Sequence, residues 1–210
     1  MPTTLLALHG YTMNGAGFRA ALSELVPRLE PHVDLVFPDA PHLCSDESLK
    51  RFYRGREAFR PSPPHRTWWY ASDDGREYDG VESSKELLRD LLGRHAPAAL
   101  LGFSQGALTA AAACGWSARG ELPPPAFAVF VAGRIPRASA LLPLFERELS
   151  VPSLHVWGTS DRFATGAPEL LARFAAASRE FTTWDGPHMV PTRGAAADSI
   201  VRFAARFAAS

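Results

Sequence analysis

The chain has 210 residues with 22 basic and 22 acidic side chains, so its formal net charge is zero. The length suffices for one domain with a full hydrophobic core, and 46% hydrophobic with 21% charged residues is typical of a soluble globular protein. Because no cluster of lysine and arginine stands out, the composition argues against nucleic acid or an anionic membrane surface as the main partner.

The N-terminal segment MPTTLLALHGYT does not have the basic start and full apolar stretch of a signal peptide. No apolar run approaches the ~20 residues that cross a bilayer. Cys44 and Cys114 lie far apart without metal-ligand spacing, which is typical of buried thiols in a reducing compartment. We therefore expect a cytoplasmic protein with one domain, residues 1–210, and no stable membrane association.

Short apolar segments alternate with longer segments of helical periodicity along the chain. Continuous rather than alternating apolar character favours strands that are covered on both faces, as in a parallel sheet. Helical spacing of apolar residues predicts the intervening helices. The predicted strands are residues 4–9, 33–37, 98–102, 127–132, 153–157 and 181–184, and the predicted helices are residues 14–29, 80–94, 105–114, 138–149, 168–177 and 193–208.

This order predicts an α/β fold: an open, mostly parallel sheet of about six strands with helices on both faces. The ligand site of such a sheet lies beyond the carboxyl ends of its strands. Residues 39–79 interrupt the alternation with a proline-rich stretch, two adjacent tryptophans and an acidic turn. A long segment without a clear element is either a lid over the active site or a packed insertion, and the sequence leaves both open.

Gly102, Ser104 and Gly106 form a G-x-S-x-G pattern between a predicted strand and a predicted helix. This is the order of a nucleophile elbow, a strained turn that exposes a reactive serine. Small residues are needed two positions before and after the serine, because strand and helix approach each other closely there. The pattern predicts Ser104 as a nucleophile, and the start of the helix supplies backbone N–H groups for negative charge.

A serine nucleophile needs a base and a carboxylate that orients it, and in this architecture both follow later strands. Asp161 follows strand 153–157, and His188 follows strand 181–184, so we predict these two as partners of Ser104. Asp185 is a weaker alternative to Asp161 because it is very close to His188 along the chain. We expect His155 to be a packed strand residue and His9 to bond the backbone of a loop.

Two backbone amides are predicted to stabilise the oxyanion. Gln105 follows the serine at the helix start, and Tyr11 follows Gly10 in the loop after the first strand. Apolar surface for an acyl chain is predicted from side chains near these positions. These candidates are Trp68, Trp69, Phe103 and Met189, although ordinary core packing is at least as good an explanation for Phe103.

Six separated motifs now agree in order with one known family. They are LHGY with Asn14-Gly15, FPDAPH at residues 37–42, Trp68-Trp69, GFSQG, HVWG with Asp161, and GPHMVP at residues 186–191. The chain resembles, over essentially its whole length, the "family of serine hydrolases" (FSH) within the α/β-hydrolases. The resemblance implies an α/β-hydrolase fold with Ser104, Asp161 and His188 as its triad. Departures around the aromatic segment and the insert at residues 60–65 put the substrate preference in doubt.

The sequence thus predicts an enzyme that cleaves carboxylic esters of small molecules through an acyl-serine intermediate. One alternative is a thioesterase that releases an acyl chain from a carrier or from coenzyme A. A second alternative, from a different class, is a non-catalytic α/β-hydrolase-fold binding module. The expected chemistry requires no metal or organic cofactor.

Overall fold

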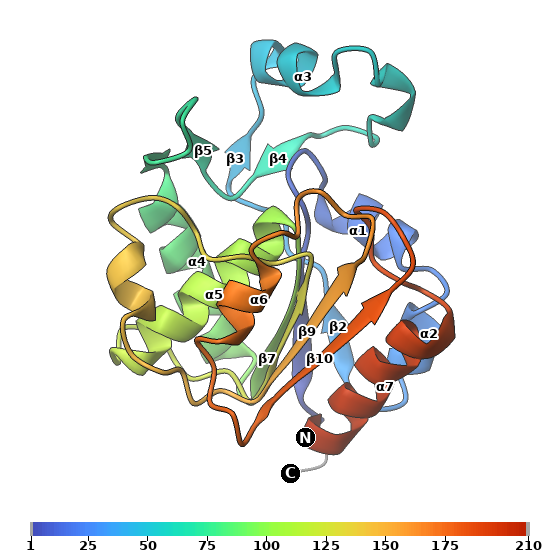
Figure 1. The fold of residues 1–210 in the computed structure, drawn as a ribbon, viewed down its shortest axis with the longest axis vertical. Coiled ribbons are helices and arrows are strands. Elements are labelled where there is room, and N and C mark those ends of the chain that lie inside the picture. The colour runs from blue at the N-terminus through green and yellow to red at the C-terminus, as the bar shows by residue number, and fades with distance from the viewer. Residues whose placement is uncertain (1, 209–210) are drawn as a thin grey trace.

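The computed structural model describes residues 2–208 (Figure 1). Its centre is a six-stranded sheet in the order β10-β9-β8-β7-β1-β2, in which every neighbouring pair is parallel. The open α/β sheet predicted from the sequence is confirmed. The strands are β1 (Thr4–Leu8), β2 (Asp34–Val36), β7 (Ala98–Phe103), β8 (Ala128–Val131), β9 (Ser153–Gly158) and β10 (Arg179–Trp184).

Helices cover both faces of the sheet, because successive strand residues point to opposite sides and those of the central strands are mostly apolar and buried. In β1, Leu6 and Leu8 pack on one side, and Leu5 and Ala7 pack on the other. The first side is covered by α4 (Val81–Arg94), α5 (Gln105–Ala118) and α6 (Ala167–Leu171). The second side is covered by α1 (Gly15–Ala21), α2 (Val26–Leu29) and α7 (Gly194–Ala208).

Three predicted helices differ from the observed ones. The predicted helix 14–29 is two helices, α1 and α2, and Pro27 lies in the first turn of the second. Proline has no N–H to continue a helix but is well tolerated in a first turn. Residues 138–149 form only the 3₁₀ turn η2 (Leu142–Phe145), whose second residue is again a proline. The helix predicted over 168–177 ends earlier, because residues 173–175 hydrogen-bond Leu149 as a bridge.

The segment 39–79 contains short elements that the sequence prediction missed. They are α3 (Asp46–Tyr53), the 3₁₀ turn η1 (Glu57–Phe59), and two small hairpins, β3 (His42–Leu43) with β4 (Arg66–Thr67) and β5 (Tyr70–Ala71) with β6 (Tyr78–Asp79). Helix α3 carries a start signal in the sequence, since the Ser45 side chain accepts a hydrogen bond from the Ser48 amide and acidic residues follow it.

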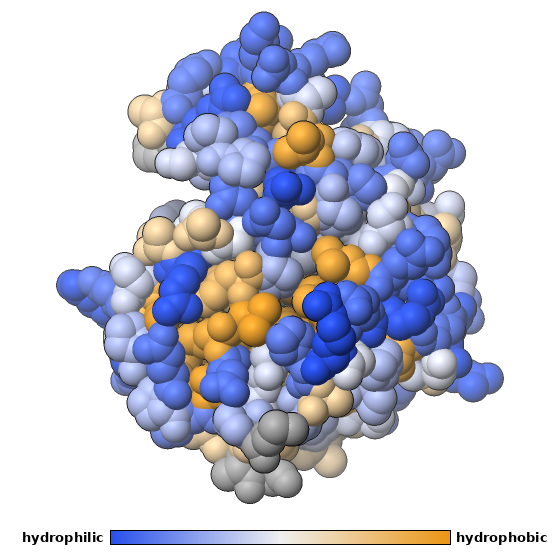
Figure 2. All heavy atoms as spheres, turned by 180° about the vertical axis from the view of Figure 1, so that it is seen from behind, coloured by the Kyte–Doolittle hydropathy of each residue, from blue (hydrophilic) through white to orange (hydrophobic). Residues whose placement is uncertain are grey.

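The segment 39–79 lies beyond the carboxyl ends of the central strands (Figure 1). Seen from behind, it forms the upper part of the molecule, with a mostly hydrophilic surface and a notch between it and the body below (Figure 2). Trp68 attaches the segment 39–79 to the body of the protein. Its side chain is fully buried, and its Nε1–H donates a hydrogen bond to the carbonyl of His9, the residue after β1, at 2.9 Å. Within residues 2–208, no helix is long and apolar enough to cross a lipid bilayer.

His155 lies inside β9 as a packed residue, as predicted. It is buried between the Phe130 and Phe174 rings, with ring centroids 4.9 and 5.1 Å away. Burial, together with the charge of Arg179, lowers the pKa of His155 to about 3. The folded protein therefore keeps this imidazole neutral at a pH where an unfolded chain protonates it.

We predict that this histidine makes the protein less stable in mild acid. Below about pH 6.5 the unfolded state binds a proton that the native state does not bind, so the free energy of unfolding falls with pH, by roughly 1 kcal/mol per unit for one such group. Urea unfolding between pH 7.5 and 5 should show a smaller decrease for His155→Leu than for the wild type. His32→Gln, at an exposed histidine, is the control and should keep the wild-type slope. An unchanged slope in His155→Leu would contradict this account.

Candidate active site

Ser104 connects β7 to α5 in an unusual backbone conformation. Its φ of +53° and ψ of −118° lie outside the regions that side-chain-bearing residues normally adopt. The surrounding hydrogen bonds hold it there: its amide donates to the Val131 carbonyl at 3.0 Å, and its carbonyl accepts from the Ala107 and Leu108 amides. The structure therefore contains the strained strand–turn–helix predicted from the sequence.

The two glycines that flank Ser104 are required by close backbone approaches. A Cβ atom at Gly102 would lie 2.4 Å from the Gly106 carbonyl oxygen, and one at Gly106 would lie 2.1 Å from the Leu8 carbonyl oxygen. Contacts this short are not accommodated by small side-chain movements, because the opposing atoms are backbone. The glycines thus let β1, β7 and α5 meet directly beneath the serine.

Ser104, His188 and Asp161 form a continuous hydrogen-bonded chain. His188 Nε2 lies 2.9 Å from Ser104 Oγ, and His188 Nδ1 lies 2.8 Å from Asp161 Oδ2. Because a carboxylate only accepts hydrogen bonds, Nδ1 carries the proton and Nε2 is left to accept the serine hydroxyl proton. The Asp161 side chain is 1% exposed, and its Oδ1 accepts from the Phe163 amide at 2.8 Å, so the carboxylate is held firmly.

A close contact between two loops brings Asp161 and His188 together. A Cβ atom at Gly158 would lie 2.1 Å from the Gly186 carbonyl oxygen. The amide of Thr159 bonds the Trp184 carbonyl, and the amide of Ser160 bonds the Gly186 carbonyl. The weaker candidate, Asp185, is exposed, and it is Asp161 that contacts the imidazole.

Of the two predicted oxyanion amides, that of Tyr11 lies in the loop after β1, and that of Gln105 follows Ser104 directly. A Cβ atom at Gly10 would lie 3.5 Å from Ser104 Cβ, so the loop after β1 lies against the serine. Gln105 is the first residue of α5. Within residues 2–208, neither amide donates a hydrogen bond to another protein group. Both are therefore free to bind an anion.

His9 fixes the orientation of the Gly10–Tyr11 peptide. The Ala40 amide donates to His9 Nε2 at 3.0 Å, so Nδ1 carries the proton and donates to the Gly10 carbonyl at 2.8 Å. Burial lowers the pKa of His9, which keeps this neutral form. A trans peptide points its C=O and N–H in opposite directions. Holding the Gly10 oxygen toward His9 therefore turns the Tyr11 N–H away from it.

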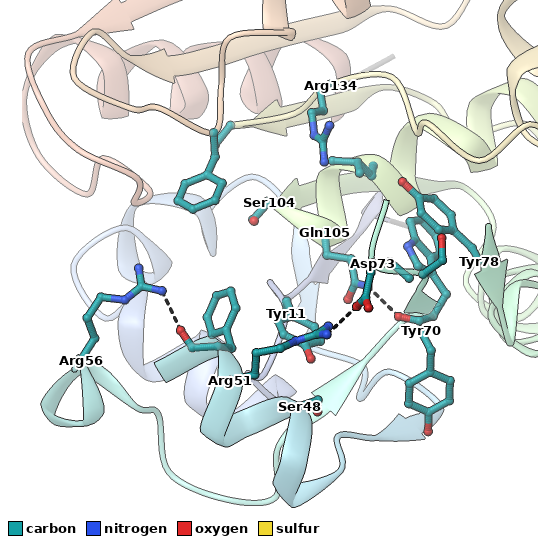
Figure 3. A pocket seen from close by; sticks show the side chains of 17 residues that line it. Tyr11, Ser48, Arg51, Arg56, Tyr70, Asp73, Tyr78, Ser104, Gln105 and Arg134 are labelled. Carbon is teal, nitrogen blue, oxygen red and sulfur yellow. Dashed lines mark hydrogen bonds and ion pairs between the residues drawn. The ribbon is translucent and has the colours of Figure 1, made fainter. Parts of the chain in front are cut away.

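A cavity of about 610 Å³ adjoins Ser104 (Figure 3). One part of its wall comes from the body of the protein and includes Ser104, Gln105, Leu108 and Arg134. Another part comes from the segment 39–79, where Arg51 of α3 pairs with Asp73 in the turn between β5 and β6. The remaining lining residues are Tyr11, Ser48, Phe52, Arg56, Trp69, Tyr70, Ala71, Ser72, Tyr78, Ala132 and Phe163.

Of the four predicted apolar contact residues, Trp69 lines the cavity and the other three do not. Trp68 packs against the His9 ring and is not part of the cavity wall, whereas Trp69, although also buried, is part of it. Phe103 stacks on Phe18 and contacts the His188 ring in a tilted arrangement. Met189 is half exposed and lies outside the cavity wall.

Most of the cavity lining was not predicted from the sequence, and Arg134 is the clearest case. A signal was available, because Arg134 follows β8 at the carboxyl edge of the sheet, where functional loops gather. The lining from α3 was missed because that helix was not predicted. Trp69 was found as a candidate, and its backbone carbonyl accepts from the Gln105 side chain at 2.9 Å.

The chain is similar to a known family and to several solved structures. Residues 1–200 match the sequence model of the family described as serine hydrolase (FSH1). An esterase of Aedes aegypti is 31% identical over 208 residues, which cover 95% of this chain and 74% of that protein. Two solved structures share the α/β-hydrolase fold: esterase PE8 (TM-score 0.67, 20% identity, 99% and 93% coverage) and the RedJ thioesterase of Streptomyces coelicolor (TM-score 0.59, 18% identity, 98% and 90% coverage).

We predict opposite effects for two glycine-to-alanine changes. Gly106→Ala should lower the free energy of unfolding by about 3 kcal/mol or more, because its Cβ has no space beside Leu8. Gly93→Ala, at an exposed position of α4 where no atom outside the helix's own backbone lies within 4 Å of the new Cβ, should raise it by about 0.5–1 kcal/mol. Thermal or urea unfolding measures both. A Gly106→Ala protein as stable as the wild type would show that the close packing beneath Ser104 is not required.

Proposed function

This chain belongs to the FSH1 serine hydrolase family and is an ester-hydrolysing enzyme, and on that basis we propose that it cleaves carboxylic esters through an acyl-Ser104 intermediate. The observation that carries the proposal is the hydrogen-bonded chain from Ser104 through His188 to Asp161 at a strained elbow. Because the chain belongs to a family of serine hydrolases and its relatives are esterases, the alternative of a non-catalytic binding module is excluded.

In the first half of the proposed reaction, Ser104 Oγ forms a bond to the ester carbonyl carbon. Its proton passes to His188 Nε2, and the carbonyl π electrons move to the oxygen. Asp161 holds the imidazole in the required tautomer and stabilises its charged form. The tetrahedral adduct then breaks the bond to the leaving oxygen, which takes the proton from His188 and departs as the alcohol.

In the second half, water attacks the acyl-Ser104 carbonyl and gives a proton to His188. When the new adduct breaks down, Ser104 recovers that proton, and the carboxylic acid leaves. In both halves the negative oxygen accepts hydrogen bonds from the Tyr11 and Gln105 amides. Removing one such donor costs about 2.7–4 kcal/mol in related chemistry, so this pair matters as much as the base.

We further propose that the segment 39–79 is an active-site insertion of a single domain and covers the substrate. The support is that Ser48, Phe52, Tyr70 and Tyr78 of this segment line the cavity beside Ser104. A cytoplasmic location, expected from the sequence, remains a prediction.

A thioester is the alternative substrate, because the same attack on a thioester carbonyl releases a thiol instead of an alcohol. Measuring kcat/KM for esters and acyl-CoA thioesters with the same acyl groups of graded length separates the two. Higher kcat/KM for the thioester at every length would assign the enzyme as a thioesterase.

We predict that Ser104→Ala lowers kcat for p-nitrophenyl acetate and butyrate by at least about 10⁴-fold, because no acyl-enzyme forms. The variant should keep the wild-type circular dichroism spectrum and fail to react with a fluorophosphonate probe. Ser117→Ala is the matched control, because it removes a serine hydroxyl near the opposite end of α5, the helix that Ser104 precedes. This variant should retain both activity and labelling. Full activity in Ser104→Ala would refute the proposed nucleophile.

We also predict a positioning role for His9. His9→Leu removes the donor to the Gly10 carbonyl, so the Tyr11 amide is no longer held, and kcat should fall about 10²-fold with a smaller change in KM. His9→Asn places an amide N–H near the position of Nδ1 and should restore part of kcat. Equal kcat values for His9→Leu, His9→Asn and the wild type, measured on folded proteins, would exclude this role.

A further inference from the structure

Arg134 brings a positive charge into the cavity beside Ser104. The residue lies in the loop after β8, which turns at Ala132, a residue with a φ of +53°. The β7–β8 register aligns Phe103 with Val131, so Ser104 and Ala132 are the next residues along adjacent strands. Adjacent strands are about 4.8 Å apart, and two residues span at most about 7 Å. The long Arg134 side chain therefore lies within reach of a short substrate bonded to Ser104.

The Arg134 guanidinium has no protein partner in the part of the chain from residue 2 to residue 208. Among these residues, no hydrogen bond or ion pair joins it to another group, although its side chain is half-buried. Burial and the charge of Arg137 lower its pKa, and the other charged or titratable group that acts on it is Tyr78. A partly buried guanidinium without an anion is unfavourable, and a bound carboxylate would offset this cost with two hydrogen bonds.

The other charged groups of the cavity do not supply that anion. Asp73 is the acidic residue of the lining, and it pairs with Arg51 across the opposite side. Arg56 donates to the Phe52 carbonyl and lies over the Phe52 ring. Figure 3 shows Arg134 on the side of the cavity formed by the body and the Arg51–Asp73 pair on the side formed by α3 and the β5–β6 turn. The cavity as a whole therefore carries an excess of positive charge.

The position of the cavity indicates which part of the substrate carries the anion. His188 gives its proton to the leaving group, so the leaving group departs on the His188 side of Ser104. His188 itself does not line the cavity, although Phe163, whose ring centroid lies 4.8 Å from that of the imidazole, does. Trp69, Tyr78 and Leu108 line another part of the cavity, and the acyl group fits there.

We propose that the enzyme prefers acyl groups that end in a carboxylate, and that Arg134 binds this carboxylate. The inference rests on the proposed function, since it assigns the acyl group that Ser104 accepts. The substrates are then monoesters or monothioesters of short dicarboxylic acids. A neutral acyl chain of the same length would leave the guanidinium without an anion.

The test compares kcat/KM for p-nitrophenyl monoglutarate with that for p-nitrophenyl valerate, and for monoadipate with that for hexanoate. Each pair has acyl chains of equal length, and the uncatalysed rate of each ester is subtracted. For the wild type we expect the anionic-to-neutral ratio to be at least tenfold, and to fall in 0.5 M NaCl. In Arg134→Met the ratio should fall to one or below, and Arg134→Lys should give an intermediate ratio.

Arg147→Met is the matched control, because it removes the same charge from an exposed site outside the cavity. Its ratio should equal that of the wild type. A third substrate, a valerate ester of a nitrophenol that carries a ring carboxylate, places the anion on the leaving group instead. A preference for this ester that depends on Arg134 would overturn the assignment to the acyl group.

Failure of this inference is distinguishable from failure of the proposed function. If valerate hydrolysis is abolished in Ser104→Ala but the wild-type ratio is near one and insensitive to Arg134, only the preference for anionic acyl groups is wrong. If no ester is hydrolysed in a manner that depends on Ser104, the proposed function is wrong and the inference falls with it. Should Arg134→Met not fold, the Arg134→Lys ratio and the salt dependence decide.

Discussion

The arrangement of the site depends on the backbone of Ser104, which is held at a φ of +53° between β7 and α5. That conformation ends the strand and starts the helix within one residue. It exposes the serine hydroxyl above the carboxyl edge of the sheet and leaves the Gln105 amide free at the helix start. It persists because Gly102 and Gly106 let three backbones meet where any Cβ would collide. The strain is local, and the packing of the whole sheet compensates for it.

The parallel sheet supplies the remaining groups because its strands all end at the same edge. Loops after β1, β8, β9 and β10 converge on Ser104, although His188 is 84 residues away along the chain. The contact between Gly158 and Gly186 sets the separation of the last two loops, and so aligns Asp161 with the imidazole. His9 acts in the same way on the loop after β1. A hydrogen bond to a carboxylate thus orients His188, and a buried neutral hydrogen bond orients the loop after β1.

Much of this could be predicted from the sequence, because the rules involved are local or topological. A small-residue turn after an apolar strand pointed to Ser104, and chain order selected Asp161 and His188. The prediction failed where tertiary packing decides. Trp68 and Trp69 are adjacent and both are buried, yet Trp68 packs against His9 and Trp69 lines the cavity. The two residues lie between β4 and β5, so the alternation of side-chain directions along a strand does not predict which one faces the cavity. Pro27 and Pro143 shortened predicted helices that apolar spacing alone supported.

The central claim is that Ser104 carries the acyl group during turnover. Rapid acid quench of the wild-type enzyme during hydrolysis of p-nitrophenyl butyrate, followed by peptide mass spectrometry, measures this directly. The account predicts a butyryl mass increase on the peptide that contains Ser104, formed within the first turnover and lost when substrate is exhausted. Turnover with an unmodified Ser104 peptide, or with the butyryl group on another residue, would contradict it.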